Sequence, residues 1–312
     1  MKGSHAEAMA QILRLRGPNQ IYGARGWSLF RLSHHRLVRH YRNTLITQLT
    51  FLSPKQKQQL AFKQSRHGAL PESEAWLDSL NDELPYVRIE KDNFQINKTC
   101  ERARNLRKNL KDSDLPADQI LDMIKEMHDL DQVATTWRQS PGWTYKTIHR
   151  SEIIQDDSTA SKFPEFVQLH QDVWIAYEWN YHRTGRILLH EELLECLDRL
   201  QSLYSGSQGN VPIDLSSFKQ ASIRIIRALI DQILSTVPQS LGDIDHEGNL
   251  TKISSGTPKC EGVGGYFLLW SIKIIKRTPS ATAEQRGIAE GVFERIRECT
   301  GMKAALGELS NI

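Results

Sequence analysis

The sequence lacks the segments that would place a protein in a membrane. A membrane helix needs roughly 20 consecutive apolar residues, and the longest apolar candidate, Val263 to Trp270, is far shorter. The first residues contain no apolar run of the signal-peptide kind. We therefore expect a chain without membrane contact that is located in the cytoplasm, or in the nucleus if it is part of a gene regulator.

Cysteine is scarce and scattered. The 312 residues include four cysteines, and none of them forms a C-x-x-C pair. Such thiols in an intracellular protein are usually reduced and buried. His34, His35 and His40 have the wrong spacing for one face of a helix, and no carboxylate lies near them in the sequence. The sequence therefore predicts neither a disulfide framework nor a metal site.

The motifs that mark the common enzyme classes are missing too. There is no Walker loop, no G-x-G-x-x-G, no H-E-x-x-H and no G-x-S-x-G. We therefore expect any chemistry to need no cofactor and no metal.

The composition is typical of a globular protein, but the charges are distributed unevenly along the chain. Apolar residues make up 39% and charged residues 25% of the chain, and the formal net charge is +3. Residues 1–67 hold twelve Lys or Arg against one acid, Glu7, so the remainder is net acidic. No aromatic side chains alternate with these charges as nucleic-acid platforms require. The pattern favours a solvated basic surface, without direct nucleic-acid binding by this chain.

Hydrophobic periodicity predicts an all-α fold with antiparallel helix pairs stacked around a central buried helix and no significant sheet. A single domain is expected over residues 1–312, with long loops at 143–161 and 243–263. The helix expected at residues 117–139 should have a core face made of Ile120, Ile124, Met127, Leu130 and Val133. The expected helices span residues 4–16, 26–50, 54–62, 72–84, 94–109, 117–139, 171–203, 216–235, 266–277 and 280–300, the last capped by Ser280 or Thr282.

The central helix is expected at residues 171–203. It is apolar nearly all round, which is typical of a buried helix. Glu178, His182, Arg186 and His190 nevertheless follow one another at intervals of four and form one column of ionisable groups. Buried charges must be paired, because otherwise each costs several kcal/mol. The column is therefore the first candidate for a site.

Five stretches, in order along the chain, resemble the fungal-specific transcription factor domain, the helical regulatory region that follows a binuclear zinc cluster in many fungal regulators. This resemblance implies an all-α regulatory fold, but fold alone does not assign a function. The stretches are LRLRGPNQIYGARGWSLF (13–30), DVWIAYEWNYHRTGRILLHEELL (172–194), VPQSLG (237–242), GGYFLLWSIK (264–273) and TPSATAEQRGIAEGVFERI (278–296).

The chain departs from the family pattern in two ways. The zinc cluster needs six cysteines near the N-terminus, whereas the first cysteine here is Cys100. The chain is then either an excised regulatory domain or, as the initial Met favours, a natural short protein that lost DNA binding. In addition, His182 stands where the family usually has tyrosine, and Ser271 replaces a common proline.

Two interpretations of the column remain open. Arg183, Arg186, His190 and Glu191 match the family motif, which favours a structural ion-pair network that clamps neighbouring helices. In the alternative, the column is the polar floor of a pocket, where an arginine holds an anionic oxygen and His190 exchanges a proton. His182 departs from the motif and can act as an acid or base near neutral pH, with Glu178 orienting it.

The sequence thus supports two functional hypotheses. The first is a cofactor-independent cyclase or isomerase of fungal secondary metabolism, with His182, Arg186, His190 and Glu178 catalytic. Trp174, Tyr177, Tyr181 and Arg183 would then bind an aromatic or polyketide small molecule. The second is the effector-binding or dimerising half of a zinc-cluster regulator. A homodimer is compatible with either hypothesis.

Overall fold

The computed structural model describes residues 85–108, 117–134, 143–153, 163–205, 214–251 and 262–299. The chain divides into two compact units, Met1–Asp82 with Gly307–Ile312 and Glu83–Leu306, and every described residue lies in the second unit. The helices expected before residue 85, and the candidate histidines His34, His35 and His40, lie outside the described residues. The single domain expected over residues 1–312 stays a prediction.

The described residues are mostly helical, which confirms the all-α class. Two short strands, β1 (Lys146–His149) and β2 (Phe166–Leu169), pair antiparallel with Lys146 opposite Leu169. None of the helices in the described ranges has the length and apolar character needed to cross a membrane. The helices are α5 (Pro85–Lys108), α6 (Ala117–Val133), α7 (Arg150–Ile153), α9 (Val173–Ser205), α10 (Leu215–Leu234), α11 (Val237–Ser240), α12 (Gly262–Arg277) and α13 (Ala283–Cys299).

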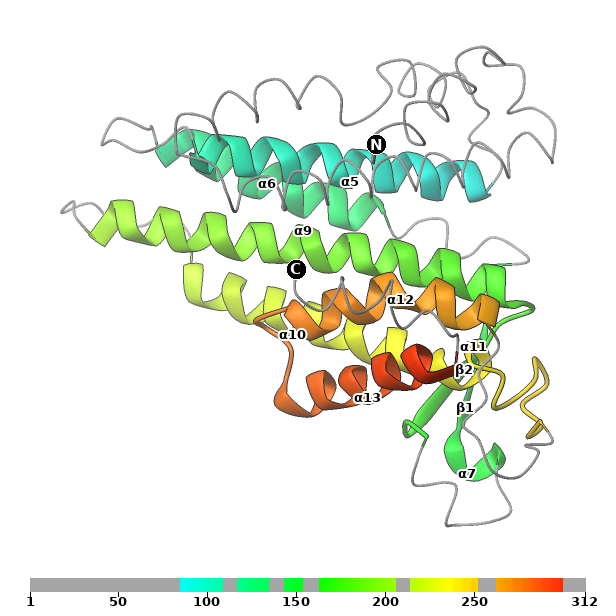
Figure 1. Ribbon diagram of the computed structural model, residues 1–312. Helices are drawn as coiled ribbons and strands as arrows, with labels where there is room; N and C mark the ends of the chain where they lie inside the picture. Colours follow the sequence, from blue (N-terminus) through cyan, green and yellow to red (C-terminus); the bar gives the residue numbers. More distant parts are fainter. Residues whose placement is uncertain are drawn as a thin grey trace, which may run out of the picture. The chain divides into compact units, whose positions relative to one another are not determined.

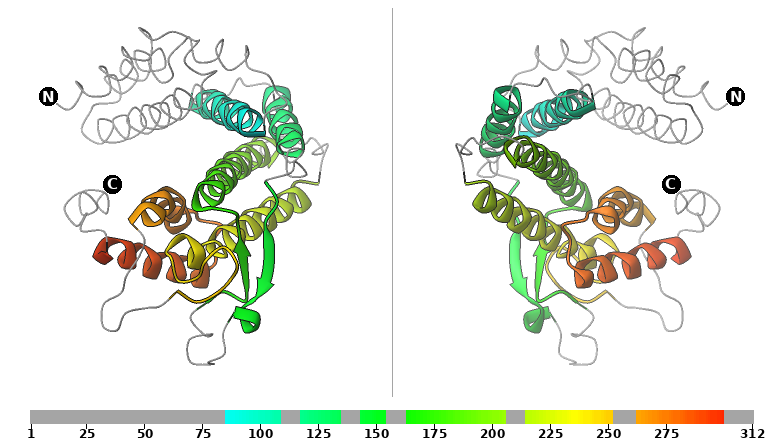
Figure 2. Two further views of the ribbon diagram at one scale, coloured as in Figure 1. Left: turned by 90° about the vertical axis from the view of Figure 1, so that its right-hand side faces the viewer. Right: turned by 90° about the vertical axis from the view of Figure 1, so that its left-hand side faces the viewer.

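The long helix α9 lies between two layers of helices. Helices α5 and α6 lie on one side of it, and α10, α12 and α13 lie on the other (Figures 1 and 2). Direct contacts join α9 to α5, α6, α10, α11 and α12. Leucines along its second half, such as Leu193 and Leu197, pack against Ile96 of α5 and Ile120 of α6 in one buried cluster. The helix expected at 171–203 is therefore present, displaced by two residues.

Side-chain caps explain where three of these helices begin. The Asp172 carboxylate accepts a hydrogen bond from the Ile175 amide at 2.8 Å, just before α9. Asp214 accepts one from the Ser217 amide at 3.1 Å at the start of α10. Before α13, Thr282 and Gln285 exchange two 3.1 Å hydrogen bonds in a capping box. The last pair confirms the predicted cap at Thr282.

The small sheet differs from the sequence prediction, which assigned residues 143–161 to a loop. Residues 146–153 of that segment form β1 and the one-turn α7 instead. Ile148, Phe163, Val167 and Leu169 make a small core of their own together with Ile244. Strands of four residues are too short to show the alternation that would reveal them in a sequence. We call the segment formed by residues 143–153 and 163–170 the hairpin module.

The second predicted loop, 243–263, ends at Gly262, where α12 already begins. Within its described part, Ile244 bridges to Leu250, and Arg295 of α13 holds the Asp243 carboxylate at 2.5 and 2.8 Å. Gly264 comes so close to α11 that a β-carbon there would lie 1.7 Å from the Ser240 carbonyl oxygen. The contact between α11 and α12 therefore requires glycine at this position.

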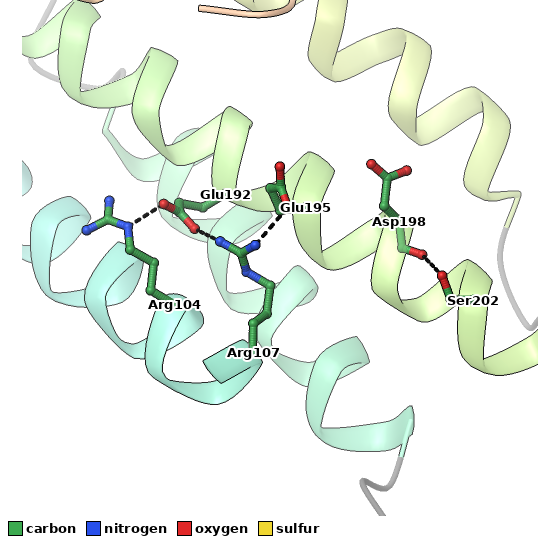
Figure 3. A network of polar contacts seen from close by, with 6 residues as sticks. All are labelled: Arg104, Arg107, Glu192, Glu195, Asp198 and Ser202. Carbon is green, nitrogen blue, oxygen red and sulfur yellow. Dashed lines mark hydrogen bonds and ion pairs between the residues drawn. The ribbon is translucent and has the colours of Figure 1, made fainter. Parts of the chain in front are cut away.

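A partly exposed ion-pair cluster joins α5 to α9 (Figure 3). Arg104 and Arg107 both bind the Glu192 carboxylate, and Arg107 also reaches Glu195 at 2.8 Å. Because these side chains remain partly in water, each pair contributes about 0–1 kcal/mol. The cluster helps to align the two helices without determining their packing.

Candidate functional site

The four side chains of the predicted column, Glu178, His182, Arg186 and His190, all lie inside the helical unit. Their exposed fractions range from 0% at His182 to 7% at Arg186. The structure therefore places these ionisable groups in the interior, as the apolar surroundings of the column in the sequence predicted. Charged groups at such depth need partners, because an unpaired buried charge costs several kcal/mol.

Asp131 of α6 is the partner of two members of the column. Arg186 donates to both carboxylate oxygens, from Nε at 2.6 Å and from Nη2 at 2.9 Å. His190 Nε2 lies 3.3 Å from Oδ2 of the same carboxylate, an ion-pair distance without hydrogen-bond alignment. The bidentate arginine contact is the stronger of the two, since it combines charge with two aligned donors.

The protonation state of Asp131 follows from competing effects. Burial by itself raises the pKa of the carboxyl group, but the polar contacts and positive charges of His190 and Arg186 outweigh it. Together they hold the pKa of Asp131 well below its ordinary value. The carboxylate therefore stays ionised at neutral pH and neutralises the Arg186 guanidinium. Of the two interpretations, these contacts favour the structural clamp for Arg186 and His190.

Asp131 was not predicted as a site residue, although a signal for it is present in the sequence. The residue continues the series Ile120, Ile124 and Met127 on the buried face of α6. A carboxylate at such a core position indicates a buried cation nearby. Val133, which was expected on this face, is exposed instead, because the helical period brings position 131 inward and turns position 133 away.

Arg183 lies in a different environment from the column. Its side chain is fully buried, and its Nη2 donates to the Gln168 side chain of β2 at 2.7 Å. Its Nη1 lies 3.2 Å from both the Asn180 side-chain oxygen and the Gln232 carbonyl. The guanidinium also lies over the rings of Trp179 and Tyr145, at 4.9 and 5.4 Å from their centroids. Arg183 therefore anchors the hairpin module to α9.

The predicted aromatic wall forms a cluster on yet another side of α9. Phe267 of α12 packs against Trp174, with ring centroids 4.5 Å apart, and stacks on Tyr177 at 4.7 Å. Tyr181 continues the row, 6.2 Å from Tyr177. Trp174 is 55% exposed. We call Trp174, Tyr177, Tyr181 and Phe267 the aromatic platform.

Ser271, the second departure from the family pattern, lies between α12 and α9. The hydroxyl groups of Thr184 and Ser271 are 2.8 Å apart, and Thr184 also donates to the Asn180 carbonyl at 2.6 Å. The Asn180 side chain in turn donates to Thr236 at 2.7 Å. A proline at position 271 could not make this contact. The serine therefore adds polar specificity to the α9–α12 contact.

The single site expected from the sequence thus separates into three environments around α9. Arg186 and His190 meet α6, Arg183 meets β2, and the aromatic platform meets α12. In the described ranges, His, Cys, Asp and Glu side chains do not gather in groups of three or more that could hold a metal ion. Comparisons with models of protein families, with curated proteins and with solved structures found no match to this chain.

Proposed function

We propose that this chain is an effector-binding regulatory domain that takes a planar aromatic small molecule on the aromatic platform. The proposal rests on the different surroundings of the ionisable and the aromatic side chains of α9. Asp131 neutralises the charge of Arg186 and contacts His190 inside the unit, whereas Trp174 reaches the surface. Arg186 and His190 therefore connect helices inside the unit, whereas Trp174 of the aromatic platform is open to a stacking ligand.

The resemblance of five sequence stretches to fungal regulatory domains supports the same proposal. One of these stretches contains Trp174, Tyr177 and Tyr181, and another contains Phe267. A ligand ring stacked on Trp174 would touch residues of both α9 and α12. Binding would then act on the contact between these helices, which Thr184 and Ser271 also join. Such coupling between a ligand and a helix contact is what a regulatory domain needs.

The binding of 1-naphthol, a simple planar phenol, tests the proposal by titration calorimetry or fluorescence. We expect Trp174→Ala to weaken binding about 2- to 10-fold, which corresponds to the loss of one aromatic contact. Phe166→Ala is the matched control, because Phe166 is an equally exposed aromatic residue on β2. Equal affinity of the wild type and Trp174→Ala, or no binding of 1-naphthol up to its solubility limit, would contradict the proposal.

A second candidate is the cofactor-independent cyclase or isomerase. It is favoured by the placement of Glu178 and His182 on successive turns of the buried column, outside the Asp131 ion pairs. His182 would accept the proton of a phenol as its oxygen bonds to one alkene carbon. The imidazolium would return this proton to the other alkene carbon, so His182 is regenerated, the product is an isomer and no oxidant is needed.

An ortho-prenyl phenol is the appropriate probe for this second candidate. Chromatography with mass detection would follow the appearance of a cyclic product of unchanged mass. His182→Gln should abolish turnover by a folded protein, and His149→Gln, on β1, should leave it unchanged. If no cyclic isomer of this probe forms above the background rate, the enzyme hypothesis fails while the binding proposal stands.

A further inference from the structure

His170 occupies the junction between the hairpin module and the helices. It directly follows β2, and the Gln239 side chain of α11 clasps its backbone, accepting from its amide at 2.8 Å and donating to its carbonyl at 2.7 Å. The side chain is 1% exposed. Among the described residues, neither ring nitrogen has a hydrogen-bond partner. A buried imidazole held in this way is tolerated only while it is uncharged.

The surroundings of His170 oppose its protonation. Its ring packs against Tyr145 and Trp179, with centroids 5.1 and 6.5 Å apart. Arg183, which lies over the same two rings, is the charged group among the described residues whose field reaches the imidazole. Tyr145 is the titratable side chain in ring contact, and Gln239 and Gln168 are neutral. Burial and the Arg183 charge lower the pKa of His170 to about 3.

We infer that His170 is an acid-sensitive latch, whose protonation releases the hairpin module from α9 and α11. Protonation would put a second positive charge beside Arg183 in the buried interior. Release returns the imidazole to solvent and removes that repulsion. The polar contacts that would open include the Gln239 clasp and the Gln168–Arg183 hydrogen bond. They also include the hydrogen bond from the Gln168 backbone amide to the Ser235 carbonyl at 3.0 Å and the Trp179–Trp143 hydrogen bond at 2.9 Å.

The size of the effect follows from proton linkage. In the released state the imidazole titrates near its ordinary pKa of about 6.5, whereas in the docked state it stays neutral down to about pH 3. Between these limits, only the released state binds the proton. Each pH unit below about 6.5 therefore shifts the equilibrium roughly tenfold toward release. From about pH 7 to about pH 5 the shift amounts to about 25-fold.

Hydrogen exchange of the full chain, measured by mass spectrometry, tests this inference. Rates at about pH 7 and about pH 5 are corrected for the intrinsic pH dependence of exchange and compared between peptides. The hairpin peptides cover residues 143–153 and 163–170, and α10 supplies the reference. We expect protection of the hairpin peptides to fall by up to about 25-fold at the lower pH, with α10 less affected.

Variants separate the latch from general acid sensitivity. His170→Phe fills the same aromatic surroundings without titrating, so its hairpin peptides should keep their protection at about pH 5. His170→Asn serves the same purpose if the larger ring disturbs folding. His149→Gln, in the same module but partly exposed, should respond to acid as the wild type does. An equal acid response in the His170 variants, or unchanged wild-type protection at about pH 4, would overturn the inference.

Discussion

Arg183 and Arg186 lie three residues apart on α9, and both carry a buried positive charge. The two charges are stabilised in different ways. Arg186 faces α6 and forms a bidentate ion pair with Asp131. The described contacts of Arg183, which faces β2, are with amide and carbonyl oxygens and with two aromatic rings. One formal charge stabilises Arg186, whereas several weaker dipoles and π-faces share the stabilisation of Arg183. The first arrangement should therefore depend strongly on one residue, and the second on several.

The largest loss of stability is expected at Arg186, whose charge is balanced by the single carboxylate of Asp131. Asp131→Ala leaves the Arg186 guanidinium buried without its carboxylate, and we expect the free energy of unfolding to fall by about 3–5 kcal/mol. Urea denaturation of Asp131→Ala and Asp129→Ala gives the comparison, because Asp129 is exposed on the same helix. A loss at position 131 no larger than at position 129 would show that Asp131 does not stabilise Arg186.

Replacing both partners sharpens the same comparison. The double variant Asp131→Leu, Arg186→Met removes the charge together with its counter-charge, so the guanidinium is not left buried without a carboxylate. Apolar replacement of a buried ion pair is often neutral or stabilising. We therefore expect stability within about 1–2 kcal/mol of the wild type, well above that of either single variant. A double variant as unstable as Asp131→Ala would show that side-chain shape, not charge, dominates this contact.

A smaller loss of stability is expected at Arg183, whose charge is stabilised by several weaker contacts. Trp179→Phe keeps a ring beneath Arg183 but removes the hydrogen bond from the indole nitrogen to the Trp143 carbonyl. The expected loss is about 1–2 kcal/mol, confined to the hairpin peptides in hydrogen exchange. If protection of α5 and α6 falls as much as that of the hairpin module, the two regions do not respond separately.

The pH dependence of the Asp131 contact has a defined sign. The pKa of Asp131 is lowered in the folded state, so its contribution is complete above the ordinary value of about 4 and is lost as the pH falls below it. The stability advantage of the wild type over Asp131→Asn should therefore shrink by up to about 1.4 kcal/mol per pH unit below about pH 4. Thermal or urea unfolding between about pH 6 and about pH 2.5 measures it. A constant difference would exclude the linkage.

The smallest effects are expected in the partly exposed cluster between α5 and α9. Glu195 is 63% exposed at its side chain, so Glu195→Ala should lower stability by less than about 0.5 kcal/mol. Glu192 is more buried and binds two arginines, so Glu192→Ala should cost about 1 kcal/mol. Both losses should diminish at high salt. A larger loss for Glu195→Ala would reverse this order.

Much of the fold was predictable from local pattern. The helical period predicted the position of α9 to within two residues, and the Thr282 cap was read correctly from the sequence. The strands β1 and β2 were missed, because four residues carry too little pattern and their pairing joins segments about twenty residues apart. The predicted start of α12 was late by four residues, since the glycines before Tyr266 resemble a loop, although Gly264 makes the close contact with α11.

The candidate site was less predictable. The sequence showed that four ionisable groups share a column and should be buried, and the structure confirms their burial. It could not supply Asp131, which lies 55 residues before Arg186 and becomes its partner only through packing of α6 on α9. It also grouped Arg183 and the aromatic residues into one pocket. On the helix these side chains point in different directions, and the neighbouring elements divided them into separate environments.

The close approach at Gly264 has a consequence for finding relatives of this chain. Any side chain at this position would collide with the Ser240 carbonyl, so α12 could not lie where it does. Packing alone therefore requires glycine at the first position of the GGYFLLWSIK stretch, whatever the protein binds. A search pattern that demands glycine there, together with the VPQSLG stretch in which Ser240 ends α11, selects for the backbone geometry itself. It would also recover homologues whose ionisable column has changed completely.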